Sequence, residues 1–188
     1  MNTGRITNQM ENQNIIQRAL AFAKKKHAGQ FRADKKTPYI AHPIRVVKIL
    51  KKFKKSHRMD ELVAAALLHD TLEDTKTGIE EIRREFGETV ALLVVQLTND
   101  LWAIKNLGKK KYHSEKLSSI DKMSSWALTI KLADRLDNIS DLNKFPRGKK
   151  WSKEYSKQTK EIVDYISKNR KLSKTQKRLI REILKILG

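Results

Sequence analysis

The apolar residues of this chain recur at helical spacing, and no stretch shows the alternation that is typical of a strand. The clearest example contains five aliphatic side chains that stand three or four residues apart: Leu128, Leu132, Leu136, Ile139 and Leu142. Side chains at this spacing share one face of an α-helix, whereas a half-buried strand has a period of two. The pattern therefore predicts an all-α domain.

Helices are also predicted before this segment. An apolar stripe at helical spacing covers residues 15–23, and the stretch GQFRADKKTP at 29–38 contains the Gly, Pro and charged residues of a loop. Pro43 suits the first turn of a helix, so the next helix is predicted to begin near it. This helix is expected to direct a row of apolar side chains into the core: Ile44, Val47, Leu50 and Phe53.

Capping signals predict where other helices begin and end. Asp60 is predicted to cap the helix that runs toward residue 70, and Thr77 and Glu80 have the spacing of a capping box. Gly87 is predicted to end that second helix, because glycine is favoured just after a helix. Another helix is expected to begin near Glu88.

The C-terminal part contains one connection and two further helices. The Lys-rich residues 107–119 are predicted to be an exposed connection, and residues 145–148 to end the helix that holds Leu128. One helix is expected over residues 151–167. The last is expected to be capped by Ser173 with Gln176, and to pack through Leu179, Ile183 and Ile186. We expect one domain, residues 1–188, of about seven to nine helices.

Composition excludes several kinds of site. There is no cysteine, so disulfides, thiolate nucleophiles and Cys-ligated zinc or iron–sulfur sites are excluded, and any metal must sit on His, Asp, Glu or water. Residues 1–14 lack the apolar segment of a signal peptide, and no later apolar run approaches the roughly 20 residues needed to span a membrane. We therefore expect a cytoplasmic protein without a membrane partner.

The formal net charge is +20, and it is uneven: residues 144–188 hold 15 Lys and Arg against 4 Asp and Glu. A basic balance indicates polyanionic partners, which include nucleic acid, anionic membranes and small phosphorylated ligands. The simpler interpretation is the solvated cationic surface of a Lys-rich protein. Charge alone does not separate these alternatives, and the sequence leaves the oligomeric state open.

Four groups capable of metal or acid–base chemistry follow the apolar run VAAALL: His69, Asp70, Glu73 and Asp74, in the stretch LLHDTLEDT. A buried unpaired carboxylate costs several kcal/mol, roughly, so acids in this setting are normally paired, hydrogen-bonded or bound to a cation. On a helix, positions four apart lie on one face, so His69 is expected to stack with Glu73 and Asp70 with Asp74. His69 and Asp70 alone cannot hold a divalent cation, and other ligands must come from elsewhere.

Two further residues are candidates for these ligands. His42, in YIAHPI, lies just before the helix predicted near Pro43, and Asp134, in IKLADRLDN, lies within an apolar helix. A lone histidine at such a place is more often a cap or a surface residue. A lone helical Asp is more often paired, here with Arg135 or Lys131, than bound to a metal.

Together these residues resemble the metal-dependent HD-domain phosphohydrolases, in which H…HD…D, here His42, His69, Asp70 and Asp134, binds one divalent metal. The segments TPYIAHPIRVVKIL, AALLHDTLEDT, TGIEEIRREFG and IKLADRLDNISDL resemble the hydrolase domain of the RelA/SpoT alarmone enzymes, in the same order, over about residues 15–145. WSKEYSKQTKEIVDYI resembles the following segment of the stand-alone, MESH1-type hydrolases, within the C-terminal helices at about 151–187.

The resemblance implies a stand-alone hydrolase with no synthetase activity, which removes the 3′-pyrophosphate of the stringent-response alarmones ppGpp and pppGpp to leave GDP or GTP. It also implies manganese at the metal site, and the mixed nitrogen and oxygen ligands favour that ion over calcium. Glu73 and Asp74 match the acids that would handle the attacking water and the leaving group; the alternative is that they are solvated acids at a helix end. The residues expected to meet the nucleotide are Arg32, Lys35, Lys36 and Asn138.

Other functions remain open from the sequence. HD proteins also dephosphorylate deoxynucleotides, cleave cyclic dinucleotides or act on adenosine alarmones. From a different class, the charge allows a nucleic-acid-binding protein on an inactive HD scaffold. Retention of all four expected ligands, together with Glu73 and Asp74, argues against that last interpretation.

Overall fold

The structure is a computed structural model that describes residues 14–98, 117, 119–142 and 149–188. Within these ranges no residue belongs to a strand, and the nine labelled helices confirm the all-α prediction. In chain order they are α2 (Ile15–Lys26), α3 (Ala41–Phe53), α4 (Met59–Leu68), α5 (Thr71–Asp74), α6 (Ile79–Phe86), α7 (Glu88–Leu97), α9 (Ser125–Asp141), α10 (Lys149–Asn169) and α11 (Lys174–Leu187).

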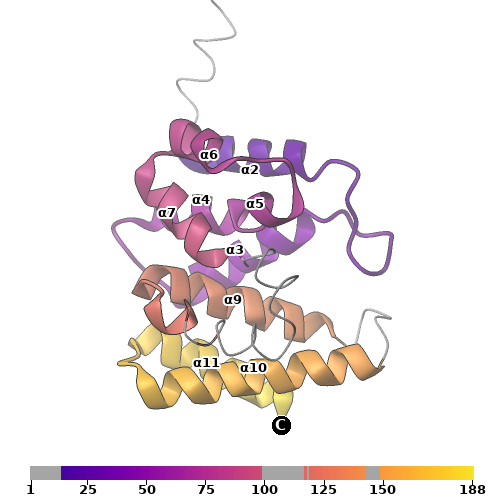
Figure 1. The fold of residues 1–188 in the computed structure, drawn as a ribbon, viewed down its shortest axis with the longest axis vertical. Helices are drawn as coiled ribbons and strands as arrows, with labels where there is room; N and C mark the ends of the chain where they lie inside the picture. Colours follow the sequence, from indigo (N-terminus) through magenta and orange to yellow (C-terminus); the bar gives the residue numbers. More distant parts are fainter. Residues whose placement is uncertain (1–13, 99–116, 118, 143–148) are drawn as a thin grey trace, which may run out of the picture.

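The helices form two groups along the long axis of the molecule. Helices α2 to α7 make up one group, and α9, α10 and α11 make up the other (Figure 1). Helix α9 joins them, because it packs against α3 and α7 on one side and against α10 and α11 on the other. The side chains that one group presents to the other therefore meet along α9.

Helix α4 is the centre of the first group. It packs against α2, α3, α7 and α9, and all seven of its residues from 62 to 68 are buried. A helix that is hydrophobic on every side is stable only when neighbours enclose it. The run ELVAAALL therefore fixes the depth at which the following residues, His69 and Asp70, lie in the molecule.

Two of the predicted helix ends are confirmed and two are wrong. Ser173 accepts a hydrogen bond from the backbone N–H of Gln176, whose side chain accepts one from Ser173 N–H, so the capping box of α11 is present. Gly87 ends α6 in the left-handed region, with φ of +83°, which favours glycine. Asp60 lies inside the first turn of α4 and does not cap it, because the N-cap position is two residues earlier in the chain than predicted, at Arg58.

The capping box predicted from Thr77 to Glu80 is also absent. Gly78 occupies the N-cap position of α6 and supplies no side-chain acceptor. The Thr77 hydroxyl lies 2.7 Å from that of Thr75 instead. The Thr77 side chain makes this local hydrogen bond and does not cap α6, which explains why the capping-box spacing gave a wrong prediction.

The predicted apolar rows of α3 and α11 are partly revised. In α3, which begins two residues before Pro43, the fully buried apolar side chains include Val46 and Leu50, while Ile44, Val47 and Phe53 are half-buried against the core. In α11, Leu179 and Ile183 are buried as predicted, but Ile186 is 46% exposed and Leu187 packs against the core in its place. The row thus continues in steps of four residues from 179.

Some expectations concern residues outside the described ranges. These are most of the connection predicted at 107–119, and the helix end predicted at 145–148. The helix expected over 151–167 is present and longer, as α10. Across the part of the chain that the structure describes, no helix combines the length and apolar character needed to cross a membrane.

Candidate active site

The sequence spacing predicted that the motif segment is one continuous helix, and the structure shows that it is broken. Helix α4 ends at Leu68, His69 and Asp70 form the junction, and the single turn α5 follows. The Asp74 N–H still donates to the Asp70 carbonyl at 2.9 Å, so the four-residue spacing between these two acids survives the break. The junction leaves Asp70 partly accessible while His69 is buried.

Three helices bring the four predicted ligands together. His42 comes from the first turn of α3, His69 and Asp70 from the end of α4, and Asp134 from the middle of α9. The Nε2 atom of His42 lies 3.3 Å from Asp134 Oδ1 and 3.6 Å from Asp70 Oδ2. The Nε2 atom of His69 lies 3.0 Å from the same Asp70 oxygen and 3.8 Å from Asp134 Oδ1.

The arrangement fits a small cation. One ligand atom each of His42, His69 and Asp134 lies within 4.8 Å of the others, and all three residues are buried. The buried Nε2 of His69 has no hydrogen-bond partner among the described residues, and a buried polar atom without a partner is costly. A divalent cation between these atoms would give that nitrogen a ligand role, as His and carboxylate donors do in many metal sites.

The electrostatics of the cluster also favour positive charge. Burial opposes the charged form of His69, but the carboxylates of Asp70 and Asp134 outweigh it and raise the pKa of His69 well above its usual value. Burial would raise the pKa of Asp134, but the ammonium group of Lys131 and the two histidines hold it well below its usual range. The site therefore stabilises ionised carboxylates and attracts cationic partners.

The two carboxylate oxygens of Asp134 face different partners. Its Oδ1 atom faces the histidines, and its Oδ2 atom lies 3.4 Å from Lys131 Nζ. The ion pair with Lys131, the alternative weighed from the sequence, is thus present without occupying the oxygen that faces the cluster. Pairing and metal binding are compatible at this residue.

Tyr39 joins the expected ligands to the expected catalytic acids, and sequence reasoning missed it. Its hydroxyl lies 2.6 Å from Asp70 Oδ2 and 2.9 Å from Asp74 Oδ2. Burial and the charge of Asp70 raise the pKa of Asp74. The only signal in the sequence was a tyrosine three residues before His42, a spacing that predicts no contact with residues 70 and 74.

The expected nucleotide-binding residues separate into two sets. Arg32 donates to Asn138 Oδ1 at 3.0 Å, and Asn138 Nδ2 donates to Asp134 Oδ1 at 2.6 Å, which places both beside the cluster. Lys35 and Lys36 are exposed on the loop before Tyr39 and lie outside the cavity lining. Backbone N–H groups of Lys36 and Thr37 donate to the Asp34 carboxylate, so this acid shapes the loop.

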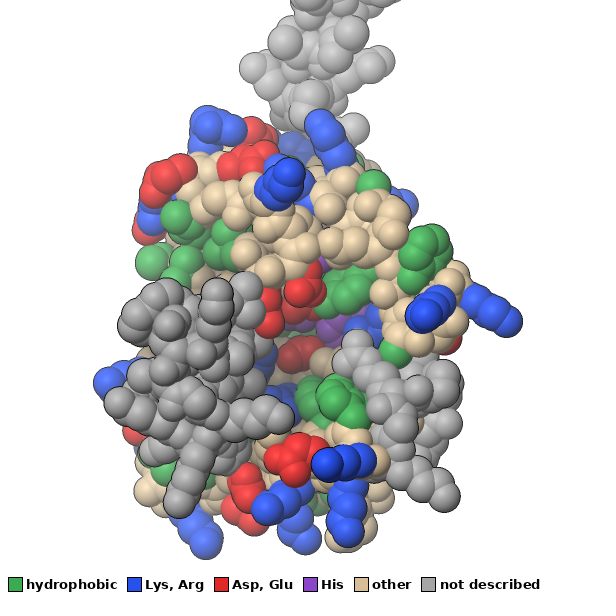
Figure 2. All heavy atoms as spheres, turned by 45° about the vertical axis from the view of Figure 1, so that its right-hand side comes forward, with side chains coloured by type: hydrophobic (Ala, Val, Ile, Leu, Met, Phe, Trp, Pro, Cys, Tyr) green, Lys and Arg blue, Asp and Glu red, His purple; other side chains and the backbone are tan. Residues whose placement is uncertain are grey.

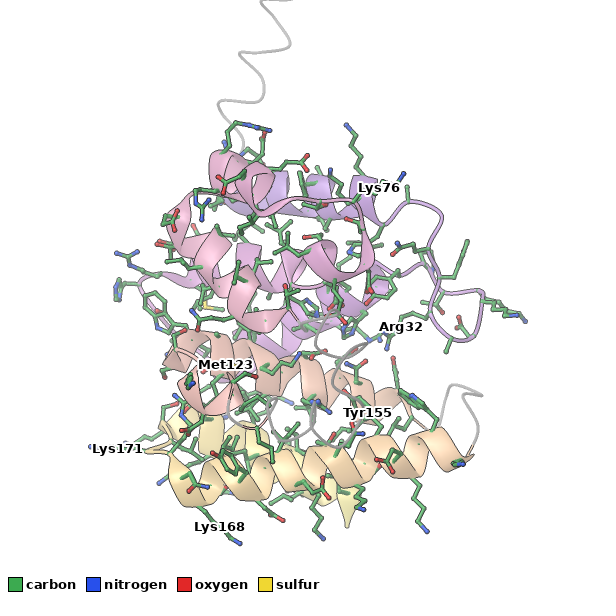
Figure 3. The ribbon with its side chains drawn as sticks, viewed as in Figure 1. Arg32, Lys76, Met123, Tyr155, Lys168 and Lys171 are labelled. Carbon is green, nitrogen blue, oxygen red and sulfur yellow. The ribbon has the colours of Figure 1, made fainter. Side chains whose placement is uncertain are left out.

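A cavity of about 520 Å³ opens between the two groups of helices, directly over the cluster. Figure 2 shows acidic and histidine side chains at the bottom of this hollow. Figure 3 shows Arg32 on the loop at one rim and Tyr155 on α10 at the other. Sequence reasoning missed the aromatic side chains at the α10 rim, Trp151 and Tyr155, because only the fold brings them opposite α5. All of the expected site residues except His69, Lys35 and Lys36 line the cavity.

Comparison with known proteins shows which family the chain resembles. The HD domain family matches residues 19–182 of the chain. A guanosine-3′,5′-bis(diphosphate) 3′-pyrophosphohydrolase from Aquifex aeolicus is 42% identical over 153 residues, which are 78% of this chain but 20% of that protein. The chain thus spans about a fifth of the length of that relative.

Shorter relatives match over most of their length. The human guanosine-3′,5′-bis(diphosphate) 3′-pyrophosphohydrolase MESH1 is 38% identical over 175 residues, 87% of this chain and 92% of its own. A solved structure of a metazoan ortholog of SpoT that hydrolyzes ppGpp superimposes with a TM-score of 0.77 at 30% identity, and the match covers 94% of this chain and 97% of that one. The similarity therefore includes the C-terminal helices as well as the motif segment.

Proposed function

Since this chain belongs to the HD domain family and to its MESH1-type hydrolases, we propose that it removes the 3′-pyrophosphate of ppGpp and pppGpp to leave GDP or GTP. We also propose that residues 1–188 form one hydrolase domain. The observation that carries the proposal is the convergence of two histidines and two aspartates below a cavity with a cationic rim residue, Arg32. A phosphorylated nucleotide suits a cavity with this charge arrangement.

In the proposed centre, His42, His69, Asp70 and Asp134 hold one divalent ion, which we propose is manganese. When bound, such an ion neutralises phosphoryl oxygens and lowers the pKa of water. The mixed nitrogen and oxygen donors support manganese or a similar ion over calcium. The two aspartates come from different helix groups, so the assembled fold is required to bring the ligands together.

Glu73 and Asp74 are the proposed acid–base residues. Both line the cavity one turn after Asp70. Asp74 is held by Tyr39, and its raised pKa brings it closer to the range in which a carboxyl group exchanges protons near neutral pH. In this proposal the pair orients and deprotonates the attacking water and supplies a proton to the leaving group.

Arg32 and Asn138 are proposed to bind the nucleotide from the loop and from α9, respectively. Their mutual hydrogen bond links the substrate side of the cavity to Asp134. Lys35 and Lys36 are proposed to add longer-range attraction for the phosphates from the exposed loop. Long-range steering of this kind weakens with salt, so its contribution is expected mainly in KM at low ionic strength.

The proposal is tested by incubating the purified protein and Mn²⁺ with ppGpp, pppGpp and pppApp and resolving the products. We expect GDP from ppGpp, GTP from pppGpp and pyrophosphate from both, with slower turnover of the adenosine compound. Turnover of pppApp alone would assign the chain to adenosine alarmones. Deoxynucleoside triphosphates and cyclic dinucleotides are assayed in parallel, and turnover of these compounds alone would contradict the alarmone proposal and favour another HD hydrolase.

The basic face of α11 is expected to be auxiliary to catalysis. Lys174, Lys177 and Lys185 are exposed, and they lie on the side of α11 opposite the residues that pack on α9. Changing all three to Glu should leave kcat within a few-fold of wild type, because these side chains lie outside the cavity lining. Steady-state kinetics at two salt concentrations is the measurement.

The same variant tests the nucleic-acid alternative. Nanomolar binding of generic RNA or DNA by the wild-type chain, with a steep salt dependence that the triple variant loses, would favour a nucleic-acid-binding protein. Weak binding that the variant does not change supports a solvated basic surface.

A further inference from the structure

The two histidines of the cluster are oriented by different kinds of partner. His69 Nδ1 lies 2.8 Å from the backbone carbonyl of Ala66, within the same helical turn. His42 Nδ1 lies 2.7 Å from Oδ2 of Asp137, a side chain 95 residues away on α9. A carbonyl and a carboxylate both accept hydrogen bonds, so both rings carry their proton on Nδ1 and turn Nε2 toward the cluster.

Asp137 is held so that its oxygens face these partners. It is 3% exposed, and Arg45 donates from Nε to Oδ1 at 2.7 Å and from Nη2 to Oδ2 at 2.9 Å. A bidentate guanidinium fixes the plane of a carboxylate and keeps it ionised. Arg45 also contacts Asp141, one turn further along α9, so the guanidinium is itself fixed.

These contacts close a ring around the cluster. From Asp141 the chain of polar contacts passes to Arg32, at 3.8 Å, then to Asn138 and Asp134, whose Oδ1 faces His42. The ring therefore joins two of the expected nucleotide-binding residues, Arg32 and Asn138, to two of the expected ligands, His42 and Asp134. Within it, Asp137 is the member that contacts a histidine through the nitrogen that faces away from the cluster.

We infer that Asp137 is a positioning residue for the metal centre. Together with Arg45 it fixes the tautomer and the ring plane of His42, and it makes His42 Nε2 a stronger electron-pair donor to the metal. The inference rests on the proposed function, because it takes His42 to be a ligand. Carboxylates that accept a hydrogen bond from the second ring nitrogen of a metal-bound histidine act in this way, and their loss weakens metal binding by about 10–100-fold. The ring of His69 is oriented by a backbone carbonyl, so no side-chain substitution can remove the hydrogen bond that fixes its tautomer.

The test is the Mn²⁺ affinity of the substrate-free protein, measured by competition with a chelator. Asp137→Leu keeps the branched shape of the side chain and removes both acceptors, so the dissociation constant for Mn²⁺ should rise by about 10–100-fold. Asp137→Asn keeps one oxygen that can accept from His42 Nδ1, so its loss should be smaller than that of Asp137→Leu. The melting temperature of each variant without metal is measured in parallel.

Asp141→Asn is the matched control, because it removes the same charge from the same arginine one turn further along α9. Its Mn²⁺ affinity should stay within a few-fold of wild type. If both Asp137 variants bind Mn²⁺ as tightly as wild type and only melt earlier, Asp137 is a structural partner of Arg45 and the inference is overturned. An equal loss in Asp141→Asn would also overturn it, since the effect would then be general electrostatics.

Failure of the proposed function gives a different result. Wild-type protein that takes up no Mn²⁺ would overturn the proposed metal centre together with this inference. Normal Mn²⁺ binding by the wild type combined with unchanged binding by the Asp137 variants would overturn the inference alone.

Discussion

Replacing Asp134 by alanine is expected to abolish both stoichiometric metal binding and turnover. Asp134 Oδ1 faces both histidines from α9, and the other proposed ligands come from α3 and α4, so the substitution removes the contribution of a whole helix group. Metal content is measured by elemental analysis after gel filtration, and kcat on the same preparation. A bound ion stabilises the folded state by mass action, so the thermal shift caused by added Mn²⁺ should also disappear.

One control variant makes this result interpretable. Asp164→Ala removes an exposed carboxylate from α10 and should change neither metal content nor kcat. Asp134→Ala removes the carboxylate that pairs with the buried ammonium group of Lys131, so the metal-free variant is also expected to melt earlier. An Asp134→Ala variant that retains one tightly bound ion would show that the proposed ligand set is wrong.

Substituting Glu73 by Gln and Asp74 by Asn, one at a time, should lower kcat by about 10²–10⁴-fold, the usual scale for a lost general acid–base group. These changes keep the size of each side chain and most of its hydrogen bonding, while they remove the charge and the ability to accept a proton. Metal binding should survive in both variants. The loss should appear mainly in kcat, because the missing interaction belongs to the transition state.

The structural alternative for these acids predicts a different pattern. If Glu73 and Asp74 only stabilise the turn of α5, kcat stays near normal and the free energy of unfolding falls by at most about 1 kcal/mol. Near-wild-type kcat in both variants would remove the catalytic assignment even if the chain hydrolyses alarmones. Measuring kcat, bound metal and stability on the same preparations separates the two cases.

Local signals in the sequence predicted most of the helices, but only some of their ends. The capping box of Ser173 and Gln176 and the stop at Gly87 depend on contacts within a few residues, which spacing can reveal. The errors at Asp60 and Thr77 arose because the N-cap positions fall on Arg58 and Gly78, and neither residue caps its helix with a side chain. Ile186 was misassigned because spacing does not decide which of two neighbouring apolar residues faces the partner helix.

The candidate site was predicted in part through family resemblance, and the rest depends on tertiary contacts. Tyr39 meets Asp70 across 31 residues of sequence, and Asp137 meets His42 across 95. Neither pairing leaves a periodic pattern, because each depends on how α3 and the loop before it pack against the rest of the fold. The break between α4 and α5 was missed for the opposite reason, since the apolar run and the acids fit one continuous helix.

The central claim is tested most directly by the fate of ppGpp labelled with ³²P in the outer phosphate of its 3′-pyrophosphate group. With Mn²⁺ and wild-type protein, we expect all of the released label as pyrophosphate and GDP as the nucleotide product, with no release in the presence of a chelator. The Asp134→Ala variant should release none. Label released as orthophosphate, or release by the metal-free protein, would contradict metal-dependent removal of the 3′-pyrophosphate at this site.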